Sequence, residues 1–126
     1  MKKIINTTNA PVAIGPYSQA TVHNNTLYVS GQLPIDPASG DLVTADISSQ
    51  TTQAMQNLKA IIEAAGGKME NILKTTILLT DLANFASVNE AYAAFFPSEP
   101  PARICYQVTA LPKGAEVEID AIVGLY

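Results

Sequence analysis

The segment from Ile72 to Thr80 constrains the fold most, because an almost uninterrupted apolar and β-branched run lies there between two helical patterns. Such a run predicts a central strand that is covered on both faces or by a partner subunit. Before it, apolar residues recur at spacings of three and four from Ile47 to Ala65, which predicts an amphipathic helix. Asp46 is its expected N-cap, and Gly66-Gly67 its expected C-terminal stop.

The other segments complete a β-β-β-α-β-α-β-β order. Residues 2–5 predict a short edge strand, and residues 18–23 and 26–31 predict a hairpin turning at Asn24-Asn25. Phe85, Val88, Tyr92 and Phe95 share one face of a second helix that the prolines from Pro97 onward end. Alternating strands follow at 102–110 and 115–126. We therefore expect an α+β domain spanning residues 1–126, with one mixed six-stranded sheet and two helices on a single face.

The composition favours one well-buried core. Of the 126 residues, 48% are hydrophobic and only 14% are charged, a balance far from that of disordered chains. A chain of this length supports one core. So few charges on a small domain also suggest that part of its surface is covered by self-association, a hypothesis that sedimentation as a monomer would refute.

The charge and the cysteine content of the chain limit the partners it can bind and the cell compartment in which we expect it. The net charge of -4 offers no basic surface for phosphates, which disfavours nucleic-acid binding. A single cysteine forms no internal disulfide, and no apolar run has the length of a signal peptide core or a membrane span. We therefore expect a cytosolic protein that does not act at membranes.

Arg103 is the first candidate site residue. Alternation on its strand places Arg103 and Cys105 on one face and Ile104, Tyr106 and Val108 on the other, and we expect the apolar face to meet the core. The planar guanidinium suits a carboxylate ligand. A surface ion pair is the simpler explanation of an arginine here, since most arginines of a small domain are solvated.

Glu118 is the second candidate. On the last strand Val117 and Ile119 share the core face, which leaves Glu116, Glu118 and Asp120 on the opposite one. A solvated strand face accounts for three alternating acids without any chemistry. Near an apolar rim, however, the pKa of Glu118 would rise toward the range where a carboxylate exchanges protons with water.

The distance between the two candidates leaves three arrangements open. In a tight hairpin across residues 111–114, Glu118 would lie opposite Gln107, roughly 13 Å along the strand from Arg103. One small ligand would not reach both. Either the two strands are not directly paired, or Arg103 reaches toward Glu118, or the site closes across a subunit boundary.

Cys105 is a poor candidate nucleophile. The only histidine, His23, lies beside the Asn24-Asn25 turn, so a Cys-His pair is rejected and a buried structural thiol is expected. One cysteine and one histidine make no zinc set. The chain also lacks the glycine-rich dinucleotide, P-loop and HExxH patterns.

Several ordered motifs carry a resemblance over essentially the whole chain. They are Gly15-Pro16-Tyr17-Ser18-Gln19-Ala20, Ser30-Gly31-Gln32, Asn89-Glu90, Pro101-Ala102-Arg103-Ile104-Cys105, and Leu111-Pro112-Lys113-Gly114-Ala115-Glu116-Val117-Glu118-Ile119. In these the chain resembles the RidA/YjgF family of reactive-intermediate deaminases. Arg103, Cys105 and Glu118 are together the set that marks the imine-deaminase branch of that family.

The resemblance implies a chorismate-mutase-like fold and a homotrimer with three ligand clefts between subunits. It also implies hydrolysis of 2-imino acids, and of their 2-amino-enoate tautomers, to 2-keto acids and ammonia. These substrates are released by pyridoxal-phosphate enzymes, and the protein itself needs no cofactor and no metal.

The resemblance further assigns roles to residues. Arg103 would bind the substrate carboxylate with the help of the backbone at Ile104 and Cys105, and Glu118 would activate water. The cleft would be lined by Tyr17, Ser30, Gly31 and Asn89, some of them from the neighbouring subunit. Tyr17 would also help with proton transfer.

Other functions remain open at this point. A 2-keto-acid-binding regulator would use the same Arg103 without turnover. Older descriptions of the family as translation inhibitors, ribonucleases or chaperones form a second alternative, and the acidic surface and single histidine argue against RNA cleavage.

Overall fold

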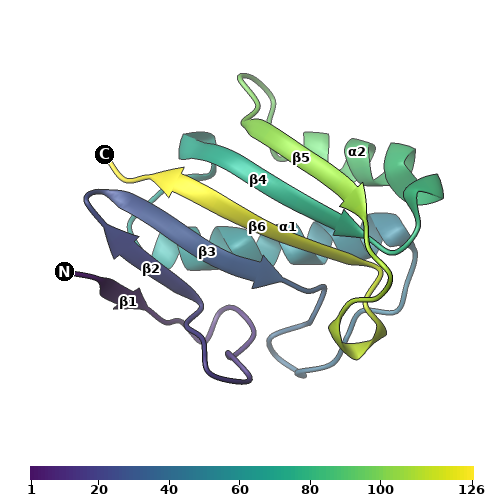
Figure 1. Ribbon diagram of the computed structural model, residues 1–126, viewed down its shortest axis with the longest axis horizontal. Coiled ribbons are helices and arrows are strands. Elements are labelled where there is room, and N and C mark those ends of the chain that lie inside the picture. The colour runs from purple at the N-terminus through teal and green to yellow at the C-terminus, as the bar shows by residue number, and fades with distance from the viewer.

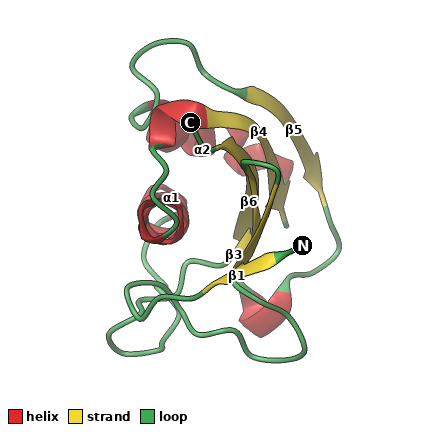
Figure 2. Ribbon diagram, turned by 90° about the vertical axis from the view of Figure 1, so that its left-hand side faces the viewer, coloured by secondary structure: helices red, strands yellow, loops and turns green.

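Six strands form one mixed sheet, and two helices lie along one of its faces (Figures 1 and 2). The computed structural model describes residues 1–126. The observed order of strands and helices is the predicted one. The strands are β1 (Lys3–Ile5), β2 (Ala20–His23), β3 (Thr26–Gln32), β4 (Ile72–Leu79), β5 (Ala102–Gln107) and β6 (Val117–Gly124), and the helices are α1 (Ile47–Ala64) and α2 (Phe85–Ala93).

The strand order in the sheet is β1-β2-β3-β6-β4-β5. The last strand in the chain, β6, lies in the middle of the sheet and pairs antiparallel with both β3 and β4, as the yellow strand in Figure 1 shows. At the edge, β5 pairs parallel with β4. Because β4 separates β5 from β6, the tight hairpin considered for these two strands does not form.

Local signals place the first hairpin turn and both ends of α1 as predicted, whereas α2 ends at Ala93, before the predicted Phe95 and Pro97. Asn24 and Asn25 connect β2 to β3 with φ values of 49° and 60°, a conformation that asparagine tolerates. The Asp46 side chain accepts a hydrogen bond of 2.8 Å from the amide of Ser49 at the start of α1. Past the end of α1, Gly66 adopts a φ of 82°.

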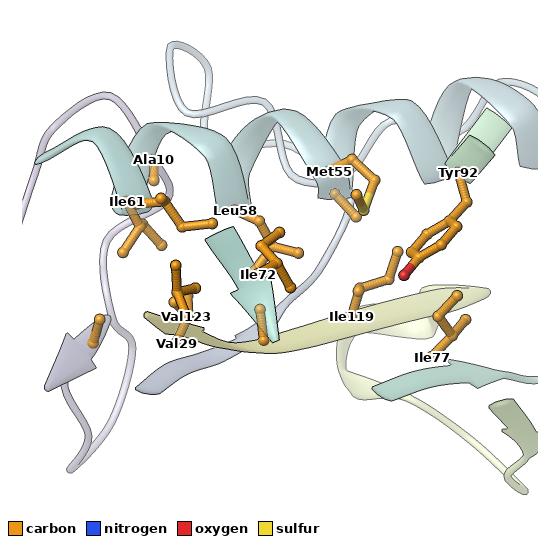
Figure 3. Packing of buried hydrophobic residues seen from close by; sticks show 14 of the residues in the cluster. Ala10, Val29, Met55, Leu58, Ile61, Ile72, Ile77, Tyr92, Ile119 and Val123 are labelled. Carbon is orange, nitrogen blue, oxygen red and sulfur yellow. The ribbon is translucent and has the colours of Figure 1, made fainter. Parts of the chain in front are cut away.

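The core fills the space between the sheet and the helices (Figure 3). Alternate residues of β6 point into it, as predicted, and α1 supplies its apolar stripe. Each fully buried Leu or Ile side chain contributes about 1.5–3 kcal/mol of transfer free energy. The side chains with no exposed surface include Leu27, Met55, Leu58, Ile61, Ile62, Ile77, Leu79, Val88, Val117, Ile119 and Val123.

The expected orientation of β5 is wrong. Cys105 packs against the core, whereas Ile104 and Tyr106 are 47% and 50% exposed on the opposite, open face of the sheet. The physical reason is the position of β5 at the sheet edge, where α2 lies against the face that carries Arg103 and Cys105. The apolar side chains of β5 therefore point away from the helices.

The strand β4 is interior to the sheet, as predicted. Within this chain it is covered only on its helix-facing side, because Leu73 is half exposed and no second layer covers the open face, so of the two expected kinds of cover only that by a partner subunit stays open. The expectation for Glu116 is wrong. Glu116 does not share the open face with Glu118 and Asp120. It lies just before β6 and accepts a 2.7 Å hydrogen bond from Gln50 of α1.

Candidate functional site

Glu118 lies at the centre of the sheet on its open face, directly over Gly31 of β3. A Cβ atom built on Gly31 would lie 2.9 Å from Cδ and 3.0 Å from Oε2 of Glu118. No side chain fits there without displacing the carboxyl group. The conformation of Glu118 therefore depends on glycine at position 31.

The environment of Glu118 raises its pKa above the usual range for a glutamate. The main cause is burial, because the half-buried carboxylate loses hydration, and the negative charge of Asp120 on the same strand adds to it. The rise that the sequence suggested for an apolar rim is confirmed in direction. A carboxylate of this kind is suited to accept a proton from water.

A cleft of about 460 Å³ opens beside this carboxylate and is called here the Glu118 cleft. It brings Glu118 together with three of the residues expected to line the substrate cleft, which are Tyr17, Ser30 and Gly31. The remaining lining is mostly apolar or comes from the 112–113 turn. Those residues are Pro11, Val12, Ile14, Gln19, Gln32, Leu33, Ile35, Pro112 and Lys113.

Hydrogen bonds within the protein limit which donors and acceptors of Ser30 and Tyr17 remain available to a ligand. The Ser30 hydroxyl donates to the carbonyl of Ser18 at 2.6 Å, so only its lone pairs remain free. The half-exposed Tyr17 accepts from the amide of Ile14 at 3.3 Å, which leaves its phenolic proton available for donation.

Two residues that shape the cleft were missed as functional positions. The buried Gln19 holds the 7–11 loop, because its Oε1 accepts from the amide of Thr7 at 2.7 Å and its Nε2 donates to the carbonyl of Pro11 at 2.8 Å. Lys113, in a turn with a φ of 61°, brings a positive charge to the cleft lining. The only sequence signal for either was its place within a quoted motif.

Arg103, the only arginine in the chain, lies on the other side of the sheet, against α2. Its Nη1 donates to Oδ1 of Asn89 at 2.8 Å, and its Cζ lies 5.5 Å from the ring centre of Phe85 and 5.2 Å from that of Tyr92. A groove of about 510 Å³ adjoins it, the Arg103 groove, whose lining includes Asn89, Tyr92, Phe96 and Pro101. Asn89, expected to contact substrate, is here the hydrogen-bond acceptor for Arg103.

Cys105 follows Arg103 as a partly buried thiol. Burial raises its pKa, and the positive charge of Arg103 offsets this only in part, so the thiol stays protonated near neutral pH. His23 lies on β2, four strand positions away, or roughly 19 Å across the sheet. The structure thus keeps the thiol and the imidazole apart, in agreement with the rejection of a Cys-His pair.

Within one chain the structure does not bring Arg103 and Glu118 together. Arg103 is paired with Thr75 and Glu118 with Leu78, two strands apart, which separates their Cα atoms by roughly 14 Å. Their side chains also point to opposite faces of the sheet, and the Glu118 cleft and the Arg103 groove share no lining residue. Of the three arrangements left open, indirect pairing of the strands is confirmed, and Arg103 does not reach toward Glu118.

No three His, Cys, Asp or Glu side chains are grouped so as to hold a metal ion. Neither helix combines the length and the apolar character of a membrane span.

The close approach at Gly31 gives a first testable expectation. Gly31→Ala places a methyl group about 3 Å from the Glu118 carboxyl, which must move. We expect the rate of the reaction in which Glu118 takes part to fall at least about tenfold. The free energy of unfolding should fall by the roughly 1–3 kcal/mol typical of overpacking. Steady-state kinetics beside thermal unfolding measure both. Gly40→Ala, where the methyl group meets no atom within 4 Å but the φ of 77° is strained, is the control for a stability cost without loss of activity. Full activity in Gly31→Ala would contradict the role given to this glycine.

Fold and site together define an α+β protein with one half-buried carboxylate of raised pKa beside a cleft and one arginine held at a sheet edge. The sequence profile described as Endoribonuclease L-PSP matches residues 7–125. The chain belongs to this family, the RidA/YjgF family, as the motifs indicated.

Individual relatives match this chain over nearly its full length. The chain is 50% identical over 122 residues to 2-iminobutanoate/2-iminopropanoate deaminase of Mus musculus, covering 97% of this chain and 90% of that one. It superposes on the crystal structure of a putative endoribonuclease from Thermotoga maritima with a TM-score of 0.97 and 44% identity, covering 100% and 99% of the two chains. For E. coli TdcF, crystallised with bound serine, the TM-score is 0.94 and the identity 42%, with 98% and 99% coverage. The predicted fold is confirmed.

Proposed function

We propose that this protein hydrolyses 2-imino acids, such as 2-iminopropanoate and 2-iminobutanoate, to 2-keto acids and ammonia. The observation that carries the proposal is Glu118, a half-buried carboxylate with a raised pKa that is fitted over Gly31 beside a cleft. The likeness to the mouse deaminase, at 50% identity, supports the same reaction.

In the proposed reaction Glu118 takes a proton from water while the water oxygen attacks the imine carbon, and the imine nitrogen becomes an amine. When the resulting carbinolamine collapses, its hydroxyl returns a proton to Tyr17, which protonated the imine nitrogen in the first step, while the keto C=O bond forms and the C–N bond breaks. The nitrogen leaves as ammonia and takes the proton that Glu118 held. Tyr17, with a free phenolic proton, is the proposed donor to the imine nitrogen.

Arg103 is the proposed ligand of the substrate carboxylate, since its planar fork matches two carboxylate oxygens. The backbone of β5 supports a second donor. The amide of Val108 donates to the carbonyl of Leu79 on β4, so by alternation the amides of Ile104 and Tyr106 also face β4, while those of Arg103 and Cys105 face the free edge. The amide of Cys105 is therefore free for a ligand, which agrees with a role for its backbone and not its thiol.

We further propose that the site is completed between subunits of a homotrimer, with Arg103 and Asn89 from one subunit and Glu118, Tyr17, Ser30 and Gly31 from its neighbour. The separation of Arg103 and Glu118 within one chain supports this. The open sheet face also supports it. Tyr28, Ile104 and Tyr106 are each about half exposed there, and burying their apolar surface under another subunit is favourable. Clefts between identical subunits recur by symmetry.

A non-catalytic keto-acid-binding module is the second candidate, and the serine bound to TdcF favours small-molecule binding in a relative. The family description names an endoribonuclease, but the net charge of -4 and an exposed, isolated His23 give no support to RNA cleavage by this chain.

The test is ammonia and keto-acid release from 2-aminoacrylate generated in the assay by a serine dehydratase. We expect the purified protein to accelerate release beyond the spontaneous rate. An unchanged rate, together with pyruvate binding measured by calorimetry, would reject the enzyme and leave the binding module.

The charge beside Glu118 gives a pH-dependent prediction. Glu118 must be ionised to accept a proton, so activity should fall as the pH drops through its raised pKa. Asp120→Asn removes the neighbouring negative charge, which lowers the pKa of Glu118 and moves the acidic limb of kcat/KM to lower pH. The other titratable groups of the cleft lining, Lys113 and Tyr17, are unchanged in this variant. Carboxyl ¹³C NMR titration of Glu118 checks the direction, and an unmoved or higher pKa would contradict it.

A further inference from the structure

One face of α2 carries three residues that contact Arg103. Phe85, Asn89 and Tyr92 are spaced four and three residues apart, so they form one stripe on the helix, called here the α2 stripe. Asn89 accepts the hydrogen bond from Nη1, and both rings lie within the distance of about 6 Å at which an arginine interacts with an aromatic face. Arg103 is thus bound through its charge, its flat faces and one N–H group.

The stripe is anchored at its buried end. Tyr92 is only 5% exposed, and its hydroxyl shares a 2.7 Å hydrogen bond with the fully buried Thr75 of β4. Its ring also packs on Phe96, with 4.9 Å between ring centres. Tyr92 therefore holds a fixed position in the core, whereas Phe85, 38% exposed, is the solvent-facing end of the stripe.

The α2 stripe reduces the entropy that Arg103, on an edge strand, would lose on binding a ligand. An exposed arginine loses about 2 kcal/mol of side-chain entropy when a ligand fixes it. A guanidinium already fixed by α2 loses less on binding, and only one N–H of its five is occupied by Asn89. The other donors remain for two carboxylate oxygens.

We infer that Phe85 and Tyr92 are positioning residues that preorganise Arg103 for the carboxylate of a 2-imino or 2-keto acid. The inference rests on the proposed function for the identity of the ligand, but the fixing of Arg103 is independent of it. No substrate contact by either ring is required, and neither ring stood out from the sequence except as a core residue.

The test uses Phe85→Leu, which removes a solvent-facing ring and leaves Tyr92 in the core. Because Arg103 is the only arginine, its Nε–Hε group gives a single NMR signal that reports guanidinium order and ring-current shift. We expect both to fall in Phe85→Leu. We also expect the Kd of pyruvate and KM to rise about two- to fivefold, the equivalent of one exposed cation–π contact, with kcat little changed.

Two variants separate positioning from general structure. Phe85→Tyr keeps an aromatic face and should restore the Nε–Hε signal and KM. Phe95→Leu removes a partly buried aromatic residue just past the end of α2 that is not one of the two rings stacked on Arg103, and it should change neither the signal nor KM. An Nε–Hε signal and KM in Phe85→Leu identical to those of the unaltered protein would overturn the inference. Loss of signal order without any pyruvate binding, even by the unaltered protein, would instead overturn the proposed ligand.

Discussion

Arg103→Ala is expected to lower deamination of 2-iminobutanoate by at least about a hundredfold and to leave the protein folded, because a bidentate charge-assisted contact to substrate is lost. The side chain is exposed and belongs to no part of the core. Its loss removes two cation–π contacts, each worth about 0.5–1 kcal/mol at an exposed site, and one hydrogen bond to Asn89. Kinetics and thermal unfolding together measure the two effects.

The control for Arg103→Ala is Lys74→Ala, which removes an exposed positive charge on the neighbouring strand outside both clefts. It should retain near-normal activity. Arg103→Lys keeps the charge but loses the planar fork, so its KM should rise. Normal turnover by Arg103→Ala would remove the carboxylate-binding role from this residue.

Glu118→Gln should lower turnover by about 10²–10⁴-fold, the contribution typical of a general base, with a milder loss of 2-ketobutyrate affinity. Glutamine has nearly the same shape and fits over Gly31 as the carboxylate does. Single-turnover kinetics measure the chemical step, and calorimetry measures the affinity.

Glu116→Gln is the matched control, since Glu116 is the neighbouring acid of the same chain segment but is bonded to Gln50 of α1. It should keep its turnover. A Glu118→Gln variant that deaminates at the normal rate would require another base and would remove the observation on which the proposed function depends.

The order of elements could be predicted because each one carries a local signal. Helical spacing with Asp46 and Gly66 defines α1, and two asparagines that tolerate positive φ define the first hairpin. Alternation also gave the core face of β6 correctly. In each case the decisive interaction lies within a few residues along the chain.

The orientation of β5 could not be predicted in the same way. Alternation separates Arg103 and Cys105 from Ile104 and Tyr106, but it does not say which set faces the helices. At an edge strand the answer depends on the position of α2 and on what covers the open face. A hydrophobicity argument therefore chose the wrong side.

The candidate site was predictable as residue types and not as geometry. Alternation along the last strand predicts that Glu118 lies off the core face, and its pKa rises there only if its surroundings are apolar. The contact with Gly31 appears only when β3 and β6 are paired, whereas the neighbouring charge of Asp120 follows from alternation within β6. Likewise, the bond from Arg103 to Asn89 joins residues 14 positions apart through a helix and an edge strand.

The most direct test of the proposed account mixes two inactive proteins. Arg103→Ala and Glu118→Gln, carrying different tags, are unfolded together, refolded and assayed for imine hydrolysis. If each site takes Arg103 from one subunit and Glu118 from the next, random trimers regain about a quarter of the unaltered activity. A mixture whose tags show exchanged subunits but whose activity stays at that of the separate variants would contradict a shared deaminase site.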